Sequence, residues 1–207
     1  MGKTWKRLTV LLVVTVAPFA TAVSISAPPA RAADSGTAAA PAPVGKSSHD
    51  AAAPLLDQLK AAKTADEAQA LEGKIWAAWM TSGDPDIDKL VQQSTQLSQM
   101  LQFDEGLAIL DTVVAKAPGY AEGWNRRATL LYMMHDFDRS LADIQKVLSL
   151  EPRHFGAISG LGLISLAKGD RDGALSAYQK VLEIDPQNAG ARQSVEMLGK
   201  ALQGNPI

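Results

Sequence analysis

The stretch "AEGWNRRATLLYMMHDFDRSLADIQKVLSLEP", residues 121–152, decides the fold because its pattern recurs on both sides of it. Its closing residue, Pro152, lies midway between two counterparts, Pro118 and Pro186. Other columns keep the same spacing: Leu90, Trp124 and Ile158; Leu107, Leu141 and Leu175; Val113, Val147 and Val181; and the small residues Gly106, Ser140 and Ala174. A shared 34-residue period predicts a repeat architecture.

Each window of the period reads as two antiparallel helices. Turns are expected at 101–102, 135–136 and 169–170, and the small column lets the two helices of a window approach closely. The proline ends the second helix, because it lacks an N–H and disfavours helical geometry in the residue before it. The windows are therefore 87–120, 121–154 and 155–188, and the predicted fold class is all-α.

Over Ile87 to Asn188 these columns resemble the tetratricopeptide repeat family. The resemblance implies an α-solenoid of about three helix pairs, whose apolar ends need covering. Residues 189–207 are expected to supply a capping helix, from Ala189 to Leu202, and a short tail. Residues 54–82 are expected to form a helical pair that caps the opposite end, with Trp76 and Trp79 packed against Leu90. Pro54 would lie in its first turn, and "TADE", residues 64–67, would be a capping box.

Residues 1–32 have the anatomy of a secretory signal peptide. Three basic residues precede an apolar run from Leu8 to Val16, and the small-x-small triplet Ala30-Arg31-Ala32 follows. Cleavage after Ala32 would release an exported, periplasmic protein, whereas a retained leader would be a membrane anchor. Residues 33–53, rich in Ala, Pro and Ser, are expected to be a disordered spacer.

Composition excludes several classes of protein. The leader holds four of the 20 basic residues and no acidic ones, so the rest carries 16 Lys and Arg against 22 Asp and Glu, a formal charge of −6. An acidic chain without a basic stripe does not favour nucleic-acid binding. With no cysteine there is neither a disulfide nor a lipoprotein anchor, and the three histidines have no metal-site or acid–base spacing. We therefore expect no catalysis, no cofactor and no metal.

Stacked helix pairs curve, and the resemblance implies that the first helices line a concave groove. The residues expected to meet a partner there are Glu122, Asn125, Arg126, Thr129, Tyr132, Met133, Ser159 and Leu163. Related repeats grip a C-terminal carboxylate with a Lys/Asn/Arg clamp. Here Val91, Thr95 and Ser159 fall where that clamp needs cationic or amide groups, which argues against it.

The adjacent arginines Arg126 and Arg127 are expected to differ in role. Arg127 follows Trp124 by one helical turn and should point toward the second helix of its own window, where Asp143 could pair with it while its stem packs on Trp124. Arg126 lies about 100° further round the helix. It is expected either to contact the neighbouring repeat or to meet an acidic or C-terminal group of a partner.

Two functions remain open on the sequence. The first is a non-catalytic adaptor or scaffold of the cell envelope that presents its groove to a peptide or helix of another protein. The alternative is a self-associating structural component, monomeric or weakly dimeric alone, that pairs copies through an exposed end helix or a tryptophan-bearing cap. The pattern does not identify the partner.

Overall fold

The computed structural model describes residues 46–203, and all secondary structure in that range is α-helical. The predicted signal peptide and most of the predicted spacer lie outside this range. None of the described helices is long and apolar enough to span a membrane. The elements are α1 (Lys46–Ala61), α2 (Ala65–Trp79), α3 (Pro85–Gln99), α4 (Phe103–Lys116), α5 (Ala121–Met133), α6 (Phe137–Leu150), α7 (Phe155–Ala167), α8 (Arg171–Ile184) and α9 (Ala189–Leu202).

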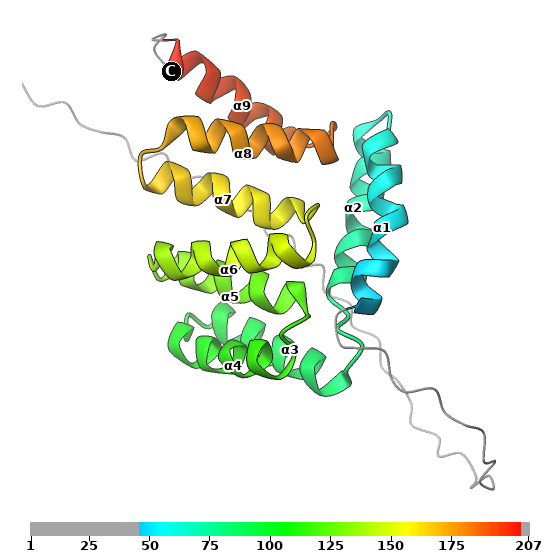
Figure 1. Ribbon diagram of the computed structural model, residues 1–207, viewed down its shortest axis with the longest axis vertical. Coiled ribbons are helices and arrows are strands. Elements are labelled where there is room, and N and C mark those ends of the chain that lie inside the picture. The colour runs from blue at the N-terminus through cyan, green and yellow to red at the C-terminus, as the bar shows by residue number, and fades with distance from the viewer. Residues whose placement is uncertain (1–45, 204–207) are drawn as a thin grey trace, which may run out of the picture. The chain divides into compact units, whose positions relative to one another are not determined.

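Helices α3 to α8 form three consecutive helix pairs that stack side by side, and α9 follows the last pair (Figure 1). The all-α solenoid predicted from the repeat period is confirmed. At the turn within each pair, Leu101, His135 and Gly169 have positive φ angles of 60°, 62° and 82°. In all three turns the next residue donates its N–H back to the carbonyl five positions earlier, which closes the first helix with a Schellman motif.

The small-residue column brings the two helices of a pair together as the sequence predicts. Ser140 and Ala174 are fully buried, and Ser140 Oγ donates to the Ala128 carbonyl oxygen at 2.7 Å. In the first pair Ser94 Oγ donates to the Gly106 carbonyl oxygen at 3.0 Å. The close contact therefore has both a steric and a hydrogen-bonded component.

The N-terminal helical pair begins earlier than expected. We predicted a spacer up to residue 53 and a helix from Pro54, but α1 already begins at Lys46 and Pro54 lies inside it. Ala52 is fully buried, and His49 Nδ1 lies 2.7 Å from Glu151 Oε2. Alanine is a strong helix former, so this Ala-rich stretch becomes helical once the array offers it a surface.

The pair α1–α2, which we call the hairpin, also packs in an unexpected place. The prediction that Trp76 and Trp79 contact Leu90 is wrong: both rings pack on Phe155 and His154 at the start of α7. Figure 1 shows the hairpin running across the ends of the stacked helices, where each repeat connects to the next. It covers the junctions between repeats and does not cap the first repeat.

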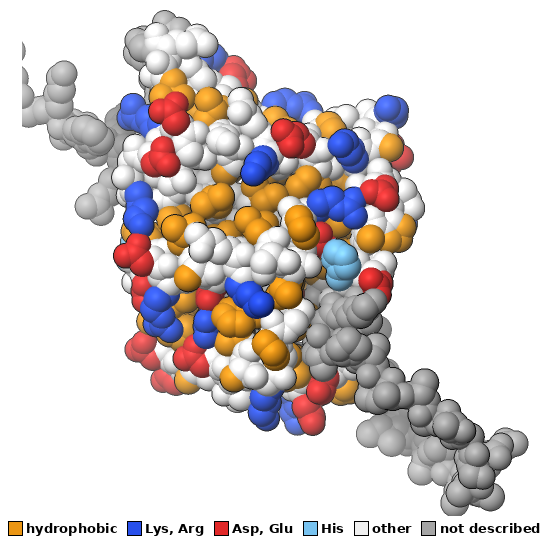
Figure 2. All heavy atoms as spheres, in the orientation of Figure 1, with side chains coloured by type: hydrophobic (Ala, Val, Ile, Leu, Met, Phe, Trp, Pro, Cys, Tyr) orange, Lys and Arg blue, Asp and Glu red, His pale blue; other side chains and the backbone are white. Residues whose placement is uncertain are grey.

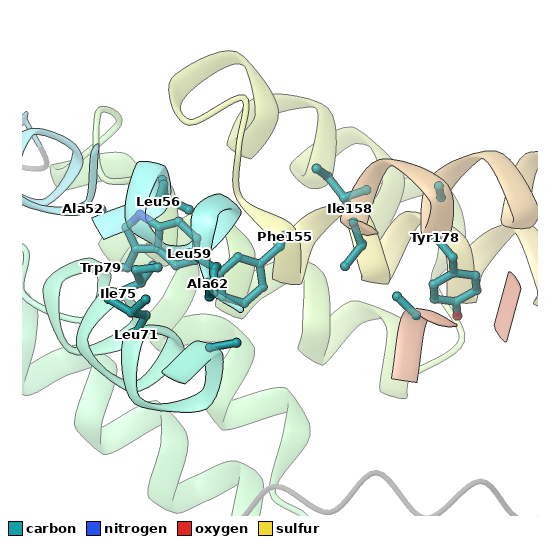
Figure 3. Close-up of a cluster of buried hydrophobic side chains, with 14 of the residues drawn as sticks. Ala52, Leu56, Leu59, Ala62, Leu71, Ile75, Trp79, Phe155, Ile158 and Tyr178 are labelled. Carbon is teal, nitrogen blue, oxygen red and sulfur yellow. The ribbon is translucent and has the colours of Figure 1, made fainter. Parts of the chain in front are cut away.

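One hydrophobic core joins the hairpin to the last repeat. It includes Leu56 and Leu59 of α1, Ile75 of α2, Phe155 of α7 and Val181 of α8, each 5% exposed or less (Figure 3). The capping box at the start of α2 is present: Glu67 N–H donates to Thr64 Oγ1 at 3.2 Å, and the Glu67 carboxylate accepts from the backbone N–H of Lys63. A local capping motif therefore begins α2, and the core that the hairpin shares with α7 and α8 holds the hairpin in place.

Candidate functional site

The helices α5 and α7 carry the predicted partner-binding residues. Along α5, Asn125, Thr129, Tyr132 and Met133 recur at the spacing of one helical turn and share one side of the helix. Thr129 is exposed and Met133 is 46% exposed. These residues lie on the side of the array formed by the first helices α3, α5 and α7, and we call this side the first-helix face.

On α7 the same face carries the predicted residues Ser159 and Leu163, which are half-buried, and Leu166, which is 40% exposed. The hydroxyl groups of this face are already used as donors. Thr129 Oγ1 donates to the Asn125 carbonyl oxygen at 2.9 Å, and Ser159 Oγ donates to the Phe155 carbonyl oxygen at 2.8 Å. These side chains therefore present aliphatic carbon and acceptor lone pairs to a ligand.

Glu122 is a correction to the predicted set. It was expected to line the groove, but it is 2% exposed. Its carboxylate accepts from Arg126 Nε at 2.7 Å, from Asn125 Nδ2 at 2.9 Å and from His154 Nε2 at 3.3 Å. Burial alone would raise the pKa of Glu122, but the His154 hydrogen bond and the Arg126 charge outweigh it and lower that pKa below its usual 4.5. Glu122 therefore organises its neighbours and is not available to a partner.

His154 connects this network to the hairpin. Its Nδ1 accepts from the Ala157 backbone N–H at 3.2 Å and so caps α7. The proton of a neutral ring then lies on Nε2, which faces Glu122. Trp79 stacks on the same ring, with centroids 4.0 Å apart and planes 11° from parallel. Sequence reasoning did not find this role of His154, because its partners Glu122 and Trp79 come from α5 and α2.

Arg126 contacts the neighbouring repeat, the first of its two predicted roles. Besides its bond to Glu122, its Nη1 donates to Thr95 Oγ1 of α3 at 3.1 Å. The side chain is only 26% exposed. Its charge is already balanced within the array, so Arg126 is a weak anchor for a partner carboxylate.

The predicted ion pair between Arg127 and Asp143 is present. Arg127 Nε and Nη2 donate to the two carboxylate oxygens at 2.8 and 2.7 Å, and its Cζ lies 4.8 Å from the centre of the Trp124 ring. A second acid, Asp111 of α4, accepts from Arg127 Nη1 at 2.8 Å. Arg127 therefore bridges the second helices of the first two repeats.

A second buried polar cluster lies where α2 meets the junction between α8 and α9. Asn188 Nδ2 donates to Glu72 Oε1 at 3.3 Å. Burial, followed by the neighbouring Asp185 carboxylate, raises the pKa of Glu72 from 4.5 to about 7. Asp185 Oδ2 is buried without another hydrogen-bond partner among the described residues, and a protonated Glu72 supplies the O–H that it needs. Sequence reasoning missed this cluster because Glu72 and Asp185 belong to distant parts of the chain, outside any shared window of the period.

Within residues 46–203 no group of three or more His, Cys, Asp or Glu side chains is placed to hold a metal ion. What the first-helix face offers is apolar and aromatic contact area with fixed polar groups between. The polar groups beside it, Glu122 and Arg126, are satisfied by each other. Such a surface recognises a ligand by shape and burial more than by charge.

Comparisons with known proteins agree with this architecture. The sequence profile of the tetratricopeptide repeat family matches residues 125–189. A tetratricopeptide repeat-containing protein of Rhizobium etli is 37% identical over 76 residues, which cover 37% of this chain and 37% of that protein. The match thus spans little more than a third of the relative's length.

Two solved structures share the fold at low sequence identity. The tetratricopeptide repeat domain of Sgt2 from Aspergillus fumigatus is 19% identical with a TM-score of 0.54, covering 60% of this chain and 87% of its own. The first such domain of Spaghetti (RPAP3), bound to the HSP90 peptide SRMEEVD, is 20% identical with a TM-score of 0.54, covering 56% and 93%.

Proposed function

Since the chain is a tetratricopeptide-repeat protein, we propose that it is a non-catalytic protein–protein interaction module of the cell envelope. Its first-helix face would take up a peptide or helix of a partner protein. Export through the N-terminal leader, with cleavage after Ala32, is part of the proposal. The role is that of an adaptor, which holds a partner and does not alter it chemically.

The observation that carries the proposal is a row of accessible side chains on α5, next to residues that contacts with the rest of the array hold in place. Tyr132 packs on Phe137 with ring centroids 5.6 Å apart, and Asn125 is held by Glu122. Thr129 and Met133 beside them point outward and are free of tertiary polar contacts in the described part of the chain. A largely pre-formed surface binds without a large ordering cost.

The ligand that this face favours is apolar in character. The RPAP3 domain binds a peptide that ends in an acidic segment, which supports peptide binding as a use of this fold. Here Val91 and Thr95 provide no cation, and Arg126 is paired with buried Glu122. We therefore expect recognition through aliphatic or aromatic side chains of the partner, with Met133 adapting to their shape.

The test is photocrosslinking in the native cell, with a photoreactive residue in place of Met133. A defined partner should be captured, and adding Thr129→Arg to the same chain should abolish its capture. Thr112→Arg is the matched control: Thr112 is exposed on α4 and makes the same kind of hydrogen bond to the carbonyl of the preceding turn. Capture that survives Thr129→Arg, or is lost equally with Thr112→Arg, would contradict the proposal.

Self-association is the second candidate, and the exposed side of α9 favours it. Met197 and Leu202 are 37% and 40% exposed on the last helix of the array. Sedimentation of the mature protein at micromolar concentration decides between the candidates. A dimer that dissociates on Met197→Lys supports self-association, and a protein that sediments as a monomer contradicts it.

N-terminal sequencing of the mature protein tests export, with Ala33 as the expected first residue.

A further inference from the structure

A second surface lies on the opposite side of the array from the first-helix face. Between the second helices α6 and α8 a groove of about 550 Å³ opens, and α1 borders it at one end. Figure 2 shows a band of hydrophobic side chains across this side of the protein. Its apolar lining consists of Leu56, Leu148, Ile158, Leu161, Ile184 and Pro152. We call this the outer groove.

The repeat register gives a physical reason for the opening of this groove. In the preceding position, between α4 and α6, the Trp124 ring lies against the Arg127 guanidinium, which spans the space between the two helices. That guanidinium binds Asp111 on one wall and Asp143 on the other. A side chain that pairs with both walls closes the equivalent site.

The residues at the corresponding positions of the third repeat cannot form that bridge. Trp124 is replaced by the smaller Ile158, and Arg127 is replaced by Leu161. The positions of the two acids are held by Gln145 and Ala177. The outer groove is thus the same structural position with its polar bridge removed, which leaves an apolar floor open to solvent.

Charges gather at the α1 end of the outer groove. Arg153 Nη1 pairs with Asp57 Oδ1 at 2.6 Å, so these two charges balance. Lys60 of α1 and Lys180 of α8 line the groove on different walls, and neither forms an ion pair with a described residue. Glu183 is the one further acid in the lining. The groove end is locally positive although the chain after its leader carries a formal charge of −6.

We propose that the outer groove binds an amphipathic helix of a partner protein, with its aliphatic side on the groove floor and acidic side chains at the end next to α1. The walls are two neighbouring helices with a third beneath them, and an added helix would lie along the same direction. Its apolar side would cover Ile158 and Leu161, while its carboxylates would meet Lys60 and Lys180. The C-terminal end of a helix carries partial negative charge, which suits this orientation.

This inference is independent of the proposed function, because the outer groove uses α1, α6, α7 and α8 from the other side. A partner held there would leave the first-helix face accessible. The protein would then join two different ligands, as a scaffold does.

The test is a selection of displayed helical peptides of about 14 residues, roughly four helical turns, on the full chain. Apolar and charged positions vary in the library. The triple variant Gln145→Asp, Leu161→Arg and Ala177→Asp rebuilds in the third repeat the bridge of the second, so it closes the groove with a motif that the fold already tolerates. Lys60→Glu with Lys180→Glu changes only exposed side chains and serves as a second variant. Circular dichroism establishes that each variant is folded.

We expect the selected peptides to carry aliphatic residues at helical spacing and acidic residues toward their C-terminal end. Both variants should weaken their binding by about tenfold or more, a loss that corresponds to removing a few central contacts. Thr129→Arg, on the first-helix face, should leave binding unchanged.

Four results would overturn the proposal. Selected peptides do not use the groove if they bind both folded variants with the same affinity as the original protein. Basic peptides, or peptides with no charge preference, contradict the assigned chemistry. Self-association that the triple variant abolishes makes a second copy the occupant. Binding of palmitate at the groove, without any selected peptide, makes it a lipid site.

Discussion

Arg126 and Arg127 are neighbours in the sequence, yet each holds a carboxylate in a different part of the array. Arg127 joins α4, α5 and α6 on the side of the second helices, and Arg126 joins α5 to α3 beside the first-helix face. The sequence predicted the pair of Arg127 with Asp143 because both residues belong to one repeat, but it did not predict the contact with Asp111 of the preceding repeat. It did not predict the burial of Glu122, because His154 and Trp79 come to that position from other elements.

Replacing Arg127 should destabilise the protein because Asp143 loses the cation that pairs with it. We expect Arg127→Ala to lower the free energy of unfolding by about 2 kcal/mol, because Asp143, with a side chain 5% exposed, is left buried and uncompensated. Arg127→Ala with Asp143→Ala should be less damaging than the sum of the two single variants. Urea denaturation measures all three. Strict additivity would show that the two side chains are not coupled.

Arg126→Ala is the comparison within the same dipeptide. Its hydrogen bonds to Glu122 and Thr95 predict that the substitution lowers the free energy of unfolding by about 1 kcal/mol. The loss is smaller than for Arg127 because Asn125 and His154 still satisfy the Glu122 carboxylate. An effect larger than that of Arg127→Ala would reverse this ranking.

At the scale of elements, the helices and turns of the repeats follow from the period, whereas the position of the hairpin does not. Each repeat position recurs with the same neighbours, so one window predicts the others. The hairpin has no counterpart in the register. Its Trp76 packs on Phe155, and its Glu72 accepts a hydrogen bond from Asn188 across 116 residues of chain. No local pattern encodes contacts of that separation.

Gly156 allows the hairpin to approach α7. A Cβ atom at this position would lie 2.6 Å from Trp76 Cη2. Gly156→Ala should therefore displace α2 and lower stability by about 1–2 kcal/mol. In the mature protein with Trp124 changed to Phe, the emission of Trp76 and Trp79 should shift to longer wavelength.

Gly190→Ala is the matched control, one period later in the same register. The added Cβ would find its nearest atom, Asn188 Oδ1, at 3.7 Å, so stability should stay level or rise slightly with the better helix former. Equal destabilisation by both substitutions would mean that the loss comes from the backbone and not from the Trp76 contact.

The contact of α2 with the α8–α9 junction should weaken as pH rises. The folded state holds the Glu72 proton up to about pH 7, because its pKa is raised there, while an unfolded glutamate releases it near 4.5. The folded state therefore binds more protons between these values, and stability falls with rising pH across this window. Because Glu72 is only about half buried, we expect a change of about 1 kcal/mol.

Glu72→Gln removes this titration and keeps an amide donor for Asp185. Urea denaturation from pH 4.5 to 8 should show a flatter stability profile for this variant than for the original protein. Asp66→Asn, an exposed substitution on the same helix, should keep the original slope. A profile that rises with pH in the original protein, or one unchanged by Glu72→Gln, would contradict the assignment.

On the scale of the whole array, stabilising contacts concentrate at one end. The hairpin, α7, α8 and α9 share a single core, whereas the first repeat relies on a smaller cluster of Ile87, Val91, Val113, Ala117 and Tyr120. The sequence predicted an array capped at both ends. The structure instead places both added elements against the third repeat, since the aromatic pair of α2 finds its partners at the start of α7.

This asymmetry predicts the order in which the array opens. In stacked repeats each unit is stabilised mainly by its neighbours, so the repeat with fewest neighbours opens first. Amide hydrogens of α3 and α4 should exchange through openings at least about 1.4 kcal/mol less costly than those of α7 and α8, a tenfold difference in rate. Native-state hydrogen exchange with mass spectrometry measures this difference.

Paired cavity variants make the prediction sharper. Ile87→Ala should accelerate exchange in α3 and α4 while α7 and α8 keep their protection, because the first repeat opens by itself. Val181→Ala should accelerate exchange in α7, α8, α9 and the hairpin together, because they share one core. The contradicting outcome is one common free energy of exchange for every helix pair, with either variant accelerating exchange in all of them equally. The array would then open as one cooperative unit. The concentration of contacts at one end would have no effect on local stability.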